Sequence, residues 1–218
     1  MNPAAVRPRC FLGLQSVRVR LGLALLTPLS VSLGEEVQVV TKDRDAHQQR
    51  VEVVSTRLDE KGNTLSETNS YVQLETGLNY RNTLGEWEET KAEFELIPEG
   101  AIAWKGQHRV SLAGDLNTAE AVQLRLPDGN LVAGHVLGLA YYDSATGDSV
   151  MIASVKDSGG WQVTPQQILY PDAFSGVEAD VRYTFSRSGL EQDIILRERP
   201  PSPEKFGFSP ATTRLEVW

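Results

Sequence analysis

The sequence predicts an all-β protein, an antiparallel β-sandwich of about a dozen short strands with minimal helix. Three observations predict this fold. Apolar and polar residues alternate along many short segments, and turn residues separate these segments at intervals of roughly ten residues. No segment has a convincing helical stripe of apolar residues, although 116–121 is compatible with a single turn.

Alternation in the first half places one set of side chains on a core and the other set in water. The alternating segments are found at 37–39, 51–53, 72–74, 94–97 and 101–104. The expected turns between segments lie at 59–63, 82–86 and 98–100. Each turn contains glycine, usually beside proline, asparagine or a charged residue, which is the composition that hairpin turns favour.

The second half contains the clearest hairpins. Val122, Leu124 and Leu126 alternate with polar residues and lead into Pro127-Asp128-Gly129-Asn130, a strong hairpin turn sequence. The runs 136–142 and 150–155 are apolar on both faces and predict central strands, joined by the loop 143–148. A turn at 186–189 joins the alternating segments 178–185 and 190–197.

The sandwich is expected to span 35–198. Arg199-Pro200-Pro201-Ser202-Pro203 ends the strand pattern, because prolines so close together cannot lie inside a sheet. We interpret 199–218 as a proline-rich linker and the start of a further strand, 212–218, that lacks a partner in the main sheets. This interpretation predicts that the chain is a fragment of a longer protein.

Residues 1–34 have the three parts of a secretory signal peptide. They contain four arginines and no acid, then the uncharged run 21–31, then the small residues Ser32 and Gly34. The run is shorter than the roughly 20 residues that span a bilayer, so no transmembrane segment is predicted. We expect Sec-type export to the periplasm, the cell surface or the medium. Cleavage is expected near Gly34/Glu35, with Ser32/Leu33 as the alternative.

Charge and cysteine content exclude several classes. The 218 residues have a net charge of −8. Residues 1–34 hold four of the 21 basic residues, so the remainder carries 17 basic and 29 acidic residues, a net charge of −12. An acidic chain without a basic block is a poor nucleic-acid binder. The single cysteine, Cys10, excludes a disulfide framework and a cysteine metal cluster.

Motifs for chemistry are scarce, and we predict no catalytic, cofactor-binding or metal-binding residues. The three histidines are isolated: His135 is expected in the core and His108 at the surface, and neither has the spacing of a zinc site. Gly147-Asp148-Ser149-Val150 is similar to the nucleophile block of one hydrolase family. That family also needs a late histidine, and none follows His135.

Acidic and aromatic residues leave alternatives open. Glu86, Glu88, Glu89, Glu93 and Glu95 are interpreted as solvated strand faces rather than a glycosidase pair. The loop from Asp143 to Asp148 is interpreted as a polar hairpin rather than a calcium site. Tyr71, Tyr80, Trp87 and Trp104 are interpreted as core residues, the alternative being a platform for a sugar or protein.

One stretch resembles a known type of module. Residues 170–177 read Tyr-Pro-Asp-Ala-Phe-Ser-Gly-Val, followed by an Asp-x-x-Tyr strand from Asp180 and a Gly-Leu-Glu-x-Asp strand from Gly189. Further matching segments lie at 70–72, 77–80, 85–87, 106–108 and 210–215. Together they resemble the uncharacterised β-rich N-terminal region of large exported bacterial proteins of the YD-repeat (Rhs-type) or similar multidomain kind. The resemblance implies downstream domains in a longer chain and no catalytic residues.

These observations favour a non-enzymatic exported β-sandwich module with a structural or interaction role in a cell-surface or secreted bacterial protein. The alternative is a carbohydrate-binding or carbohydrate-cleaving domain on the same scaffold, because a fold alone does not determine function. The expected partner is a protein or a glycan, and no cofactor is expected.

Overall fold

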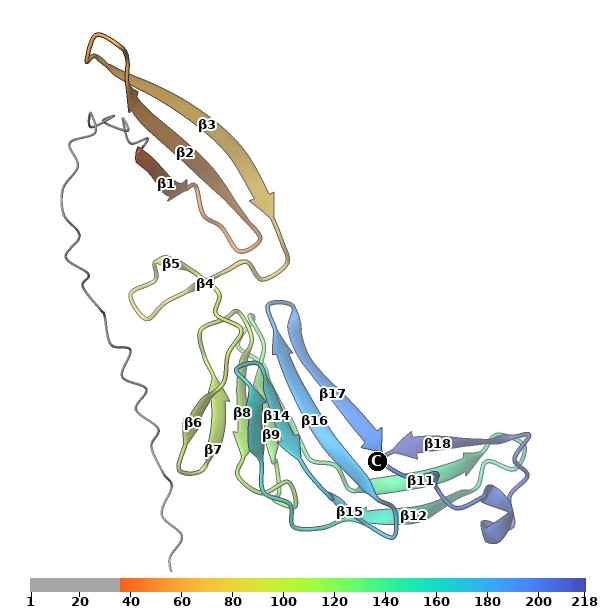
Figure 1. Ribbon diagram of the computed structural model, residues 1–218. Helices are drawn as coiled ribbons and strands as arrows, with labels where there is room; N and C mark the ends of the chain where they lie inside the picture. Colours follow the sequence, from red (N-terminus) through yellow and green to blue (C-terminus); the bar gives the residue numbers. More distant parts are fainter. Residues whose placement is uncertain (1–35) are drawn as a thin grey trace, which may run out of the picture. The chain divides into compact units, whose positions relative to one another are not determined.

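The computed structural model describes residues 36–218, so the predicted signal peptide lies outside the described residues. The described part contains eighteen strands and one short 3₁₀ helix, η1 (Pro203–Phe206) (Figure 1). All strand pairs are antiparallel, which confirms the predicted all-β, sandwich-like class. More strands form than the expected dozen, because several of them are only two to four residues long.

The first sheet has the order β1-β2-β3. Its strands are β1 (Glu36–Lys42), β2 (Gln48–Leu58) and β3 (Thr64–Leu74). The predicted turn at 59–63 connects β2 and β3, with Asp59 accepting hydrogen bonds from the backbone of Lys61 and Asn63. Val51 is the only apolar side chain of these strands that is buried, so most of this sheet is exposed on both faces.

A two-stranded ribbon follows, formed by β4 (Asn79–Arg81) and β5 (Trp87–Glu89). Asn79 is fully buried and holds the start of the ribbon to the β1–β2 connection. Its side-chain oxygen accepts a hydrogen bond from Arg44 at 2.8 Å, and its amide nitrogen donates to the carbonyl oxygen of Asp45 at 2.8 Å.

The next sheet has the order β10-β9-β8-β7-β6. Its strands are β6 (Glu95–Ile97), β7 (Gly100–Ala103), β8 (Arg109–Ala113), β9 (Val122–Arg125) and β10 (Leu131–Gly134). The predicted turns at 98–100 and 127–130 both form. In the second turn, the backbone N–H of Leu126 donates to Asn130, and Gly129 adopts a φ of 91°.

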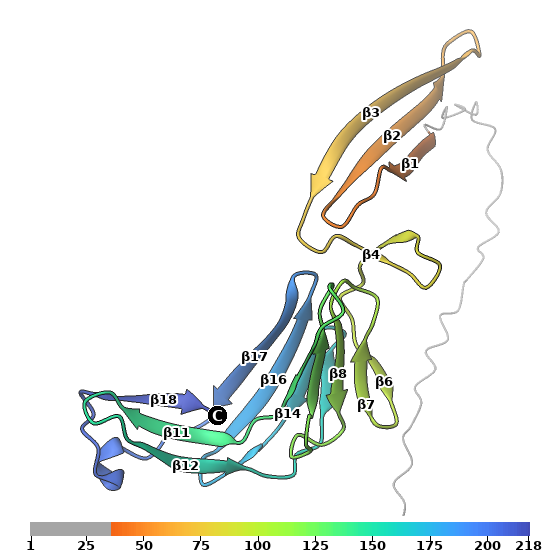
Figure 2. The ribbon, with the colours of Figure 1, turned by 180° about the vertical axis from the view of Figure 1, so that it is seen from behind.

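A four-stranded sheet with the order β13-β14-β16-β17 lies beside the β6–β10 sheet in both Figure 1 and Figure 2. Its strands are β13 (Trp161–Thr164), β14 (Gln167–Tyr170), β16 (Ala179–Ser186) and β17 (Gly189–Leu196). The alternation predicted for 178–185 is confirmed, since Val181, Tyr183 and Phe185 are buried and the intervening residues are half-buried.

The last sheet has the order β15-β12-β11-β18. Its strands are β11 (Gly138–Asp143), β12 (Ser149–Val155), β15 (Phe174–Ser175) and β18 (Thr213–Val217). Both runs predicted as central strands are inner strands here. Only β11 is buried along most of its length, whereas β12 exposes one of its faces.

The prediction that the last strand lacks a partner is wrong, because β18 pairs with β11 from Leu139 opposite Val217 to Asp143 opposite Thr213. The proline-rich segment folds back instead of leading away. The Tyr141 hydroxyl donates to the carbonyl oxygen of Pro201 at 2.7 Å, and the ring of Phe206 in η1 meets the Tyr141 ring edge-on. Prolines are excluded from sheet interiors, but a loop rich in proline can still return a strand to the sheet.

The core lies between the β6–β10 sheet and the two later sheets. Its largest buried side chains include Phe94, Phe174, Phe185, Tyr170 and Tyr183. The rings of Phe94 and Phe185 are tilted toward each other with their centroids 5.9 Å apart. The rings of Tyr170 and Tyr183 meet edge-on with their centroids 6.0 Å apart. The β1–β3 sheet contributes no side chain to this core. No helix in residues 36–218 is long and apolar enough to cross a membrane.

Candidate functional site

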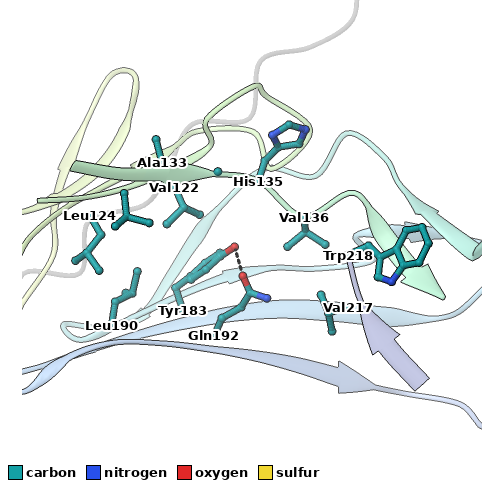
Figure 3. Close-up of a pocket in the computed structure, with 12 residues that line it drawn as sticks. Val122, Leu124, Ala133, His135, Val136, Tyr183, Leu190, Gln192, Val217 and Trp218 are labelled. Atoms are coloured by element: carbon teal, nitrogen blue, oxygen red, sulfur yellow. Dashed lines mark hydrogen bonds between the residues drawn. The ribbon is translucent and has the colours of Figure 1, made fainter. Parts of the chain in front are cut away.

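An apolar groove opens between the two faces of the sandwich (Figure 3). Its volume is about 360 Å³. Val122 and Leu124 of β9 point toward Leu190 and Tyr183 of the facing sheet. Tyr183 forms a buried floor, and its hydroxyl donates to the side-chain oxygen of Gln192 at 2.8 Å. The groove therefore offers an apolar surface with one fixed polar pair.

Three edge strands border this apolar groove, because β10, β17 and β18 each end their sheet. β10 is not protected by charge: its four residues carry none, and Leu131 and Val132 are 51% and 56% exposed. Natural edge strands are usually blunted by charges, prolines or bulges. The outer backbone groups of β10 are thus available beside an apolar groove.

His135 lies at the rim of the apolar groove and is exposed, so the expectation of a core histidine is wrong. The apolar residues before it form the exposed edge strand β10, whereas Val136 after it is buried, so an apolar sequence here does not imply burial. His108, expected at the surface, is half-buried, and no group of the described residues hydrogen-bonds its buried Nδ1. His47 Nδ1 accepts a hydrogen bond from the backbone of Gly77 at 3.1 Å.

A second hollow, of about 370 Å³, collects arginines and aromatic residues. Arg81, Arg109 and Arg125 line it together with Tyr80 and Trp87, and we call it the arginine pocket. Arg109 and Arg125 also border a smaller neighbouring hollow lined by Trp104. Of the four aromatic residues expected in the core, Tyr80 is buried, Trp87 is half-buried, and Trp104 and Tyr71 are exposed.

The hydroxyl of Tyr80 is held by Glu88, which accepts its hydrogen bond at 2.8 Å. Burial, followed by the hydrogen bond and charge of Glu88, raises the pKa of Tyr80 to about 12, and the nearby charge of Arg109 opposes this shift. Hydrogen bonds from Asn82 and Tyr80 hold the pKa of Glu88 below its ordinary value. Glu88 is therefore committed to positioning Tyr80.

The other acidic residues singled out from the sequence are mostly engaged with basic or polar neighbours. Glu89 accepts a hydrogen bond from Arg187 at 2.7 Å, and Glu95 accepts one from the Trp104 indole N–H at 2.9 Å. A hydrogen bond from Lys105, then that from Trp104, holds the pKa of Glu95 below its ordinary value. Among residues 36–218, no carboxylate lines the apolar groove or the arginine pocket.

In the loop from Asp143 to Asp148, the carboxylate of Asp143 is already occupied by hydrogen bonds from the protein. Asp143 is buried and accepts the backbone N–H of Ala145 at 2.9 Å, while the N–H of Asp148 donates to the hydroxyl of Thr146 at 3.2 Å. Hydrogen bonding from Thr212, then from Ala145, holds the pKa of Asp143 below its ordinary value. Across residues 36–218, no three histidine, cysteine or acidic residues gather in a group that could hold a metal.

Neither the apolar groove nor the arginine pocket is evident from the sequence. The predicted turn at 127–130 places Arg125 beside Gly129. The position of Arg125 opposite Arg109, however, depends on the register between β8 and β9, which no tight turn connects. Comparison of the chain with models of protein families, with curated proteins and with solved structures found no match.

Proposed function

We propose that this protein is a non-enzymatic, exported β-sandwich module that binds an extended strand of a partner protein at the bacterial cell surface or within a larger secreted protein. The carrying observation is the uncharged, exposed edge of β10 beside the apolar groove. A partner strand added to such an edge gains backbone hydrogen bonds, and its alternate side chains enter the groove.

Several features of the apolar groove support a strand as the occupant. Val132, Ala133 and Gly134 of β10 form one wall, so a chain paired with β10 lies along the groove itself. Leu190 and Val217 supply apolar contacts on the other side. We therefore expect the partner segment to carry apolar residues at every second position.

The test uses two lysine substitutions on edge strands of matched exposure. Val132 in β10 is 56% exposed and Val163 in β13 is 57% exposed. Peptides selected from a displayed random library are expected to show alternating apolar residues. Val132→Lys should weaken their binding at least tenfold, because a charge on an edge opposes strand addition. Val163→Lys should leave it unchanged.

Three outcomes contradict the strand-binding proposal. If the selected peptides show no alternating apolar residues, recognition does not occur by strand addition. If Val132→Lys and Val163→Lys weaken peptide binding equally, the assignment of binding to the edge of β10 is wrong. Concentration-dependent dimerisation, measured by sedimentation and abolished by Val132→Lys alone, makes a second copy of the chain the occupant instead of a partner protein.

The proposed location is tested separately. When the full chain is expressed in a bacterium, we expect cleavage near Gly34, because the basic start, short apolar run and small residues fit signal peptidase. Intact-mass measurement of the protein from the periplasm or medium reports the cleavage position. Recovery of the uncleaved chain from the cytosol would contradict export.

A second candidate function is carbohydrate binding, favoured by the arginine pocket, where Tyr80 and Trp87 meet three arginines. Aromatic and hydrogen-bonding side chains are the groups that such sites combine. We propose binding rather than cleavage, since a glycosidase places two carboxyl groups across its cleft and none lines this pocket.

A further inference from the structure

Two arginines face each other in the arginine pocket without a carboxylate between them. Arg109 of β8 lies directly opposite Arg125 of β9, and neither forms an ion pair with any described residue. Like charges at directly opposite positions destabilise a sheet. The chain does pair other arginines with acids, namely Arg50, Arg182, Arg187, Arg197 and Arg214. Arg109 and Arg125 thus place two uncompensated positive charges side by side in an acidic protein.

The arginine pocket holds two of its guanidinium groups in place. Arg81 lies over the ring of Trp87 at 4.3 Å and donates to the carbonyl oxygen of Gly85. Arg125 donates to the carbonyl oxygen of Gly129 at 3.3 Å. Side chains that are already ordered lose less entropy when they bind a ligand, so these contacts prepare the pocket for an anion.

The remaining walls suit a small polar ring. Leu126 and Pro127 give apolar surface, and Gln107 contributes an amide. The Gln107 nitrogen donates to the carbonyl oxygens of Ala46 at 2.6 Å and Asn79 at 2.9 Å, which leaves its side-chain oxygen to accept a hydrogen bond. A volume of about 370 Å³ lies in the range of small-molecule sites, roughly 300–1,000 Å³.

We propose that the arginine pocket binds the carboxylate of an acidic saccharide, with Arg109 and Arg125 as the carboxylate-binding residues. Guanidinium groups bind carboxylates through paired, charge-assisted hydrogen bonds, and the amide oxygen of Gln107 accepts from a ring hydroxyl. This inference deepens the second candidate function, because it names the class of saccharide. It does not depend on strand binding at β10.

Other anionic ligands fit the pocket less well. A peptide would gain little backbone pairing, because the edge strands that line the pocket, β4 and β5, are only three residues long. A nucleic acid would meet the net charge of −12 over residues 35–218, which repels a dense polyanion. One carboxylate on a sugar ring needs only the local positive charge of the arginines.

The test titrates the protein with trigalacturonate, its methyl ester, neutral trigalactose, inorganic sulfate and a triglutamate peptide, using calorimetry. We expect trigalacturonate to bind most tightly and the methyl ester to lose at least tenfold. Arg109→Gln and Arg125→Gln should each weaken trigalacturonate binding at least tenfold. Arg57→Gln is the matched control, because Arg57 is an exposed strand arginine without an ion pair among the described residues.

A second readout needs no ligand. Removal of one facing charge should leave the melting temperature of Arg109→Gln unchanged or raised, which separates lost binding from lost folding. Tighter binding of sulfate or triglutamate than of trigalacturonate overturns the saccharide assignment. Binding of the neutral and acidic sugars with equal affinity overturns the acidic refinement but leaves carbohydrate binding standing. Absence of binding to every sugar overturns both.

Discussion

Gly100→Ala is expected to lower the free energy of unfolding by about 4 kcal/mol or more. Gly100 begins β7 with a φ of 148°, where side chains are strained. A Cβ at this position would lie 2.0 Å from the carbonyl oxygen of Leu112 and 2.7 Å from the backbone nitrogen of Gly114. Both atoms belong to the neighbouring backbone, so the β7–β8 pairing must separate. Urea unfolding followed by tryptophan fluorescence measures the change.

The matched control for Gly100→Ala is Gly189→Ala. Gly189 has nearly the same φ, 152°, but a Cβ there meets nothing within 4 Å. Its substitution should cost only the backbone strain, about 1–3 kcal/mol. Equal losses in the two variants would show that strain, and not the contact with the Leu112 carbonyl, sets the stability at Gly100.

Alkaline pH is expected to unfold the protein through its buried tyrosines. Burial raises the pKa of Tyr183 to about 12 and raises that of Tyr170 further, and burial with Glu88 raises that of Tyr80 to about 12. Well below pH 10, the ordinary pKa of tyrosine, all three are protonated in both states, so their stabilising effect is fully present. Above pH 10 the unfolded chain loses protons that the folded chain keeps, so stability falls as pH rises toward 12.

Each buried tyrosine should remove about 1.4 kcal/mol of stability per pH unit in this window. Urea unfolding at pH values from 8 to about 11.5 measures the slope. Tyr183→Phe should make the slope shallower, because it removes one of the buried hydroxyl groups. Tyr71→Phe is the control, because Tyr71 is 56% exposed and should leave the slope unchanged. A flat pH dependence above pH 10 would contradict the role of the buried hydroxyl groups.

The sequence predicts those parts of the fold that local chemistry determines. The turns at 98–100, 127–130 and 186–189 form as expected, because glycine and its neighbours fix a hairpin whatever surrounds it. Alternation in β16 likewise predicts which residues face the core. Packing of β14 against β16, by contrast, depends on register between segments, which no local pattern specifies.

The candidate sites depend almost entirely on such long-range register. His135 was expected in the core because its neighbours are apolar, but the neighbours that precede it form the exposed edge that makes β10 a candidate binding strand. Arg109 and Arg125 come from strands that a hairpin rule does not connect. Tyr80 and Trp87 were recognised as aromatics in strands, although the sequence does not reveal that arginines surround them.

The pairing of β18 with β11 has a consequence for the order of folding. A hydrogen bond from Ser144 to Thr212 beside this ladder spans 68 positions in the chain, whereas β11 and β12 are joined by a short turn. Closing a long loop has a higher entropic cost and is slower than forming a local hairpin. When the chain is synthesised from its N-terminus, the β11–β12 hairpin therefore forms before β18 exists. For that time, the edge of β11 that later pairs with β18 is uncovered. During that interval, the apolar, aromatic strand β11 is exposed to misassociation, and pairing with β18 ends that risk.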